Sequence, residues 1–217
     1  IAVQFELGGK TCTMGGMLKG SGMIHPNMAT TLTFITTDAA VSEELIQRAL
    51  SDNVKLTLNR ASVDGDTSTN DMVCVMASGS AGNAPVNTEN ADFEAFSRAL
   101  YAIMMNLARM MARDGEGATK LIECSVSGAE TEKVAETVAK SVICSSLFKA
   151  AMFGEDANWG RILCAVGYAD ADFDINKVDV KIGSSKGVVD VCKNGAGVDF
   201  SEDEAKKILG EEVIEIL

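Results

Sequence analysis

The chain has 217 residues, 47% hydrophobic and 23% charged, which is enough for one sizeable domain or two small ones with a buried core. Nineteen Lys and Arg against 31 Asp and Glu give a formal net charge of −12. Because nucleic acids and anionic membranes are bound through basic patches, this balance argues against both partners. No apolar run approaches the roughly 20 residues of a membrane span.

Six cysteines are spread along the chain, without the Cys-x-x-Cys pair or Cys/His cluster that would indicate a metal site. Most of them lie in apolar runs such as MVCVM and RILCAV, where Cys behaves as a small buried hydrophobic residue. We therefore expect reduced thiols, no bound metal and a cytoplasmic location.

The first quarter of the chain has the pattern of strands. Residues 1–7 alternate between apolar and polar side chains, and 11–18 plausibly return as a second strand after the turn at 8–10. Residues 19–29 contain two Gly and a Pro, which predicts a loop. Residues 30–37 resume the strand pattern with β-branched and aromatic side chains.

Helices enter next. Ser42 is a typical N-cap, and two Glu residues follow it in the first turn, where the helix dipole favours them. Residues 61–70 predict a polar loop, 71–78 an apolar strand, and 90–112 a long helix with apolar spacing near 3.6.

The second half continues this mixture. It predicts a loop at 113–120, a strand at 121–127, a helix at 131–152, two short strands at 178–182 and 187–192, and a helix capped by Ser201 with Glu204 three residues on. Without a regular strand–helix–strand alternation, the class is α+β. The chain opens and ends inside strand-like segments, which indicates a piece of a longer protein.

Two segments resemble known binding loops but lack residues that those loops require. GGKT at 8–11 lacks the first Gly of a phosphate-binding loop, because Gln4 stands there, so a hairpin turn explains it better. DGDTSTN at 64–70 resembles a calcium loop but has Thr69 and Val75 where Gly and Glu are required. We interpret it as a hydrogen-bonded loop that supports a site.

Thr30 stands where the Gly-containing loop meets a strand, and on position alone this is a weak signal. The whole string KGSGMIHPNMATTLTFITTDA, residues 19–39, resembles the self-cleavage region of ornithine acetyltransferases, also called bifunctional glutamate N-acetyltransferases. Residues 62–71, 113–123 and 140–162 match further stretches of that family in the same order.

The resemblance implies a precursor that cuts itself between Ala29 and Thr30, after which Thr30 is the catalytic nucleophile. Such a cut has a physical logic. The only histidine, His25, is a loop residue and is more often solvated than catalytic in such a place, so the chain offers no well-placed imidazole base. A free α-amino group has a pKa of roughly 7.7–8.0 against roughly 10.4 for Lys, so it is neutral roughly 300 times more often at pH 7.

The implied reaction is a ping-pong acetyl transfer from N-acetylornithine to glutamate through acetyl-Thr30, within arginine biosynthesis. The implied substrate-binding residues are Lys19, Thr30 and Glu116. An ammonium group at Lys19 suits a substrate carboxylate, and a carboxylate at Glu116 suits a substrate ammonium. No cofactor is implied, although acetyl-CoA is an alternative donor in some relatives, which adds an amino-acid N-acetyltransferase activity.

The implied fold is a layered αββα sandwich over residues 1–117, followed by a smaller α+β unit over 118–217, with the cleaved α and β chains associated into a heterotetramer. Thr31 stands where the family usually has Met, and on a strand adjacent threonines face opposite sides. The family's upstream Thr-Gly oxyanion-hole motif and its C-terminal substrate contacts are not in this sequence. An aminopeptidase or amidase with an N-terminal nucleophile, and an inactive fragment, are the alternatives.

Overall fold

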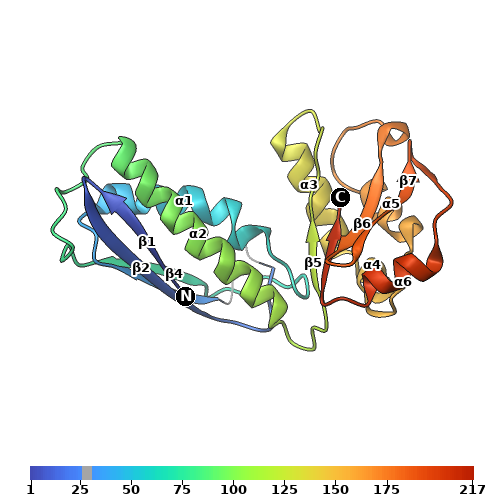
Figure 1. Ribbon diagram of the computed structural model, residues 1–217, viewed down its shortest axis with the longest axis horizontal. Coiled ribbons are helices and arrows are strands. Elements are labelled where there is room, and N and C mark those ends of the chain that lie inside the picture. Colours follow the sequence, from blue (N-terminus) through green and yellow to red (C-terminus); the bar gives the residue numbers. More distant parts are fainter. Residues whose placement is uncertain (26–30) are drawn as a thin grey trace. The chain divides into compact units, whose positions relative to one another are not determined.

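The computed structural model describes residues 1–25 and 31–217, which form two compact units, Ile1–Glu116 and Gly117–Leu217 (Figure 1). The division falls one residue before the boundary at 117/118 that the sequence led us to expect.

Unit 1 is built on a four-stranded sheet in the order β1-β2-β3-β4. Its strands are β1 (Ala2–Leu7), β2 (Lys10–Lys19), β3 (Leu32–Thr37) and β4 (Met72–Ala77). The first three strands are antiparallel neighbours, whereas β4 runs parallel to β3. The predicted strands are thus confirmed over the described residues, and β3 is a central strand with a partner on each side.

Two helices, α1 (Glu43–Leu56) and α2 (Ala91–Arg113), cover one face of this sheet (Figure 1). The buried residues of α2 recur at the helical spacing that predicted it, from Phe96 to Met111. A Cβ added to Gly16 of β2 would lie 2.8 Å from Ile103 Cγ2 of α2, so a small residue at this position lets the helix approach the sheet closely. Phe96, Leu100, Ile103 and Met104 form the centre of the core between the layers.

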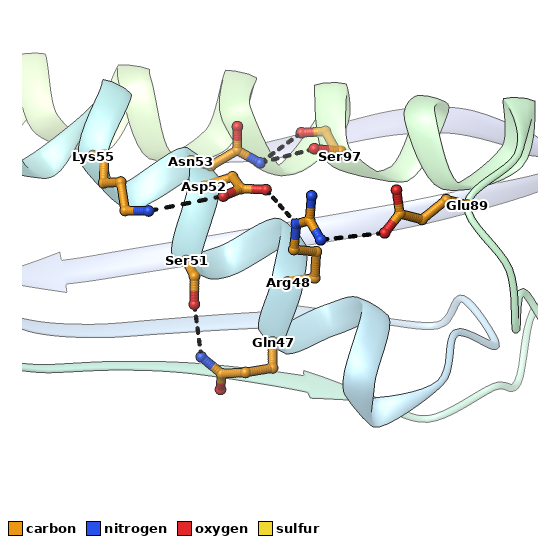
Figure 2. Close-up of polar contacts among 8 residues, drawn as sticks. All are labelled: Gln47, Arg48, Ser51, Asp52, Asn53, Lys55, Glu89 and Ser97. Atoms are coloured by element: carbon orange, nitrogen blue, oxygen red, sulfur yellow. Dashed lines mark hydrogen bonds and ion pairs between the residues drawn. The ribbon is translucent and has the colours of Figure 1, made fainter.

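Helix α1 is joined to α2 by a buried amide. Asn53 of α1 donates from Nδ2 to the carbonyl oxygen and the hydroxyl of Ser97, each at 3.1 Å (Figure 2). On the exposed side of α1, Arg48 pairs with Asp52 at 2.8 Å and with Glu89 at 3.4 Å. Exposed ion pairs contribute little, so the buried amide and the apolar core hold the two helices together.

The other face of the sheet carries exposed apolar side chains. Strand alternation places one set of residues against the helices and leaves the other set outward. We call the outward set the open face; it consists of Met17, Leu32, Phe34, Met72 and Met76, which are 71, 43, 37, 40 and 48% exposed. Large contiguous apolar patches on a protein surface mark interaction sites.

The α+β class is confirmed, and unit 1 supplies one helix layer and one sheet layer of a layered sandwich.

Unit 2 has a five-stranded sheet in the order β5-β9-β6-β7-β8. Its strands are β5 (Leu121–Cys124), β6 (Val180–Ser184), β7 (Gly187–Lys193), β8 (Ala196–Gly197) and β9 (Val213–Ile216). Its helices are α3 (Glu132–Cys144), α4 (Ser146–Phe153), α5 (Trp159–Gly167) and α6 (Glu202–Leu209), which share one apolar core with the sheet. Ser201 caps α6 by accepting a hydrogen bond from Glu204 N, as its position in the sequence predicts.

The single helix predicted over 131–152 is wrong, because the segment breaks into α3 and α4 at Ser145. This residue has an extended backbone, with φ −72° and ψ 113°, and its hydroxyl accepts a 3.3 Å hydrogen bond from Phe148 N. Ser145 therefore ends α3 and caps α4, a competition with helix continuation that short polar side chains favour. No pattern in the sequence predicted the two-residue strand β8.

Within the part of the chain that the structure describes, no helix combines the length and the apolar character needed to cross a bilayer.

Candidate functional site

Three of the four stretches that carry the resemblance come together in unit 1. They are the end of β2 with the loop to His25, the loop 62–71, and the segment after α2 that ends at Glu116. The predicted cleavage site, Ala29 and Thr30, lies outside the described residues. The residues on both sides of it are described, and they define the surroundings of the site.

Lys19 is the last residue of β2 and lies opposite Leu32, the first residue of β3. Its side chain is exposed, and the alternation of β2 places it on the same side of the sheet as Met17. The ammonium group of Lys19 is thus available at the end of the strand that leads into the loop.

Glu116 contacts the same loop. Its backbone N–H donates a 2.7 Å hydrogen bond to the carbonyl oxygen of Ser21. Its carboxylate lies beside Gly22, because a Cβ added there would stand 2.9 Å from Glu116 Oε2. The structure therefore brings Glu116 to the loop that begins next to Lys19.

The loop 62–71 holds the upstream side of the predicted cleavage site. Asp64 accepts hydrogen bonds from Met23 N at 2.6 Å and from Ile24 N at 3.0 Å, and Val63 N donates to Ile24 O at 2.7 Å. Met23 has a φ of +58°, a left-handed conformation that is uncommon for a residue with a side chain. The two bonds to Asp64 hold the backbone in this conformation.

His25 is also bound to this loop. Its Nδ1 lies 3.0 Å from Ser62 Oγ, and the hydroxyl of Thr67 donates to its carbonyl oxygen at 3.0 Å. The side chain is half-buried rather than solvated. The first contact fixes the imidazole and the second fixes the backbone, so both hold this histidine against the loop.

The downstream side is held by Asp71 and Met72. Thr31 is 2% exposed, its N–H donates to Asp71 Oδ1, and its carbonyl oxygen accepts from Met72 N at 2.9 Å. Burial raises the pKa of the Asp71 carboxyl, and the hydrogen bond from Thr31 opposes that rise. Among the described residues, no group donates to the buried Asp71 Oδ2.

The sequence did not assign a role to Asp64 or Asp71. Asp64 begins the stretch 64–70 that we interpret as a supporting loop, and Asp71 follows that stretch directly. The signal was the spacing of its carboxylates, which resembles a calcium loop. In the structure Asp64 accepts backbone N–H groups instead, and no group of three or more His, Cys, Asp or Glu among the described residues is arranged to hold a metal ion.

The fourth stretch, 140–162, lies in unit 2. Asn158 accepts a hydrogen bond from Arg161 N and so caps α5, while Arg161 Nη1 donates to Leu147 O in α4 at 2.8 Å. These contacts join α4 and α5 within unit 2.

Comparison with known proteins identifies the family. The sequence model of the ArgJ family matches residues 1–217, the whole chain. The chain belongs to the ArgJ family. Among the relatives of this ArgJ-family chain, "Arginine biosynthesis bifunctional protein ArgJ 1" of Clostridium acetobutylicum is 51% identical over 215 residues, 99% of this chain and 53% of that protein. The corresponding protein of Caldanaerobacter subterraneus is 51% identical over 217 residues, 100% of this chain and 54% of its own length.

A solved structure confirms the fold of the ArgJ-family chain. The crystal structure of "Arginine biosynthesis bifunctional protein argJ" from Bacillus halodurans matches with a TM-score of 0.75 and 44% identity, covering 83% of this chain and 84% of that one. The chain spans about half the length of the curated relatives that it matches. The resemblance to ornithine acetyltransferases is thus confirmed at the level of the family.

Proposed function

We propose that the protein to which this chain belongs transfers an acetyl group from N-acetylornithine to glutamate through an acetyl-Thr30 intermediate. Membership of the ArgJ family supports this, since its matched members are named as bifunctional proteins of arginine biosynthesis. The observation that carries the proposal is the arrangement around the predicted nucleophile. Hydrogen bonds hold both flanks of residues 26–30, and Lys19 and Glu116 meet the same loop.

Self-cleavage precedes transfer. The Oγ of Thr30 attacks the carbonyl carbon of Ala29, the C–N bond breaks, and the hydroxyl proton passes to the departing nitrogen. Water hydrolyses the resulting ester: its oxygen joins the Ala29 carbonyl carbon as the bond to Oγ breaks, one proton goes to Oγ, and the other is released to solvent, leaving a carboxylate on Ala29. Thr30 then carries a free α-amino group beside its hydroxyl, and this amine is the base that activates it.

Acetyl transfer follows in two balanced steps. The Oγ of Thr30 attacks the acetyl carbonyl, and ornithine leaves after its nitrogen receives the proton taken from Oγ. The amine of glutamate then attacks the ester, and Oγ recovers its proton as N-acetylglutamate leaves. Lys19 binds a substrate carboxylate and Glu116 a substrate ammonium, which orients the acetyl group toward the nucleophile. An oxyanion hole stabilises the developing charge and comes from outside this sequence.

The choice of Thr30 over Thr31 has structural support. Thr31 directly precedes β3 and is 2% exposed, in step with the buried residues Thr33 and Ile35 of that strand. Its N–H is occupied by Asp71. A substrate could not reach this hydroxyl without unpacking the sheet, which leaves Thr30 as the reactive residue of the pair.

Cleavage at 29/30 leaves the two chains joined by the sheet. The cut falls between β2 and β3, which pair in antiparallel register from Met14–Thr37 to Lys19–Leu32. Ile24 from the upstream piece is fully buried, as is Ile35 from the downstream piece. We therefore expect the α and β chains to remain associated through hydrogen bonds and core packing, as the building unit of a heterotetramer. We further propose that the reaction needs no metal or organic cofactor and that the enzyme is cytoplasmic.

The test uses the full-length protein as its gene encodes it, with intact-mass measurement and a transfer assay. Thr30→Ala is expected to abolish both cleavage and transfer, whereas Thr31→Val, which keeps the buried shape, leaves cleavage at 29/30 intact. Normal transfer by Thr30→Ala would refute the proposal. Release of free acetate that glutamate does not suppress would identify an amidase instead, and a single uncleaved, inactive species in the wild type would identify an inactive protein.

A further inference from the structure

We propose that Asp64 and Asp71 are positioning residues for self-cleavage, because their carboxylates anchor the backbone amides on the two sides of the predicted cleavage site. This inference rests on the proposed function. The inference extends the proposed function by assigning a role to two residues that do not touch the reacting atoms.

The upstream anchor is Asp64. One carboxylate accepts from two consecutive amides, those of Met23 and Ile24, and also from Asp66 N at 3.0 Å in its own loop. Three backbone N–H donors on one carboxylate fix the loop 62–66 against the segment before the site. A backbone in the left-handed region, as at Met23, costs about 1–3 kcal/mol and persists only where its surroundings determine it.

The downstream anchor is Asp71, seven residues further along the same loop. It accepts the N–H of Thr31, the amide that follows directly after the predicted nucleophile. Because the next residue, Met72, begins β4 and binds Thr31 O at 2.9 Å, this anchor is built into the β3–β4 pairing. A single loop thus holds both ends of the segment that contains the scissile bond.

This arrangement meets a requirement of the reaction. An intramolecular attack is fast only when the hydroxyl oxygen is kept about 3–3.5 Å from the carbonyl carbon, and small misplacements cost large factors in rate. Fixing both ends of a short segment reduces the conformations that it can adopt. We call Asp64 and Asp71 together the clamp. The clamp therefore accelerates the first step, the shift of the acyl group from nitrogen to oxygen.

Stability alone does not explain Asp71. Among the described residues no donor reaches its buried Oδ2, and burial of a carboxylate is unfavourable for folding. The upward shift of its pKa reports the same desolvation. A residue that is costly to the fold and placed next to the nucleophile is typical of a functional site.

The experiment follows cleavage of the newly synthesised full-length precursor by mass, with circular dichroism to establish that each variant is folded. Asp64→Ala and Asp71→Ala are expected to slow cleavage at least about tenfold at a temperature well below unfolding. Asp71→Asn keeps an oxygen that accepts the Thr31 N–H, so it is expected to restore most of the rate. Asp66→Ala is the matched control, an exposed carboxylate of the same loop, and is expected to cleave like the wild type.

Hydroxylamine separates the two chemical steps, because it cleaves an ester that has already formed. We expect it to leave the alanine variants slow, since the shift to the ester is the impaired step. The proposal would be overturned if folded alanine variants cleaved at the wild-type rate. It would also be overturned if the loss of cleavage rate merely matched the fraction of unfolded protein, or if hydroxylamine fully restored the rate. A wild type that does not cleave at 29/30 would instead refute the proposed function, so the two failures are distinguishable.

Discussion

The amide of Glu116 donates a 2.7 Å hydrogen bond to the carbonyl oxygen of Ser21, which joins the end of α2 to the loop that leaves β2. Ninety-five residues of sequence separate these two groups. The Glu116 carboxylate lies beside Gly22, in the loop that follows Lys19. Two predicted substrate-binding residues of opposite charge are thus coupled through one short loop.

Gly22→Ala is expected to raise the KM for N-acetylornithine, because the new methyl group would lie 2.9 Å from Glu116 Oε2 and displace the carboxylate. The displaced atom is the end of a flexible, exposed side chain, so the free energy of unfolding should change by less than about 0.5 kcal/mol. Glu116→Gln should raise the same KM by about 10- to 100-fold, the range for losing a charge-assisted hydrogen bond. Steady-state kinetics with thermal unfolding provide the measurement.

The control for these variants is Asp114→Asn, which removes an exposed carboxylate two residues before Glu116. Its KM should equal that of the wild type. If Glu116→Gln leaves KM unchanged while Asp114→Asn raises it, the assignment of the carboxylate is wrong.

Lys19→Gln is expected to raise the KM for both amino-acid substrates by about tenfold or more, since each carries a carboxylate that pairs with the ammonium group. Lys19→Arg keeps the charge and should recover part of the affinity. Lys10, the exposed first residue of β2 at the opposite end of the strand, provides the matched control. Equal kinetics for Lys19→Gln and Lys10→Gln would contradict a substrate role for Lys19.

The elements of this fold followed largely from local patterns in the sequence. The alternation in 1–7 and 30–37 and the apolar spacing in 90–112 report which side of each element meets the core, so β1, β3 and α2 were predictable. Ser145 was missed because its hydroxyl competes with a helix that the apolar pattern continues through. The spacing of apolar residues reports which side of a helix is buried, and a capping serine does not change that spacing.

The site depended on long-range contacts that no local pattern contains. Lys19 and Glu116 entered through the family resemblance, and only the structure shows that Glu116 meets the loop after Lys19. Asp64 was visible as one of several alternating acidic and polar residues, but its partners, Met23 and Ile24, lie about forty residues upstream. Carboxylates that accept backbone amides have no fixed sequence spacing to those amides.

The open face is expected to lie at the association surface of the complete protein. Met17→Glu would place a charge in an apolar area that includes its neighbour across the sheet, Phe34. Burying an unpaired carboxylate is strongly unfavourable, so the complex of cleaved chains should dissociate at lower denaturant concentration or elute as smaller species. Gln4→Glu, at an exposed position of the edge strand β1, is the control and should leave assembly unchanged. Unchanged assembly of Met17→Glu would show that this face stays open to solvent.

The cysteines should differ widely in reactivity. Burial raises the pKa of the Cys124 thiol to about 12, so only about one molecule in 10⁴ carries the thiolate at pH 8. Cys164 is exposed and should be alkylated first by iodoacetamide, as read from peptide masses. Raising the pH from 8 to 10 should increase the Cys124 rate about 100-fold, because the reactive thiolate becomes tenfold more abundant with each unit below the pKa. Equal labelling of the two thiols in the folded protein would contradict the burial of Cys124.

Gly197→Ala is expected to destabilise unit 2. A Cβ at this residue would lie 2.3 to 2.9 Å from three atoms of the Trp159 indole, which is too close for packing without movement of the ring or of β8. Overpacking of this kind costs about 1–3 kcal/mol. Trp159 is the single tryptophan of the chain, so its fluorescence reports the change directly during denaturant unfolding.

The control is Gly167→Ala, in the same helix as Trp159. The added methyl group meets nothing within 4 Å, so this change should be neutral or stabilising by up to about 1 kcal/mol, because alanine favours a helix over glycine. A midpoint for Gly197→Ala equal to that of Gly167→Ala would show that the indole moves aside without cost.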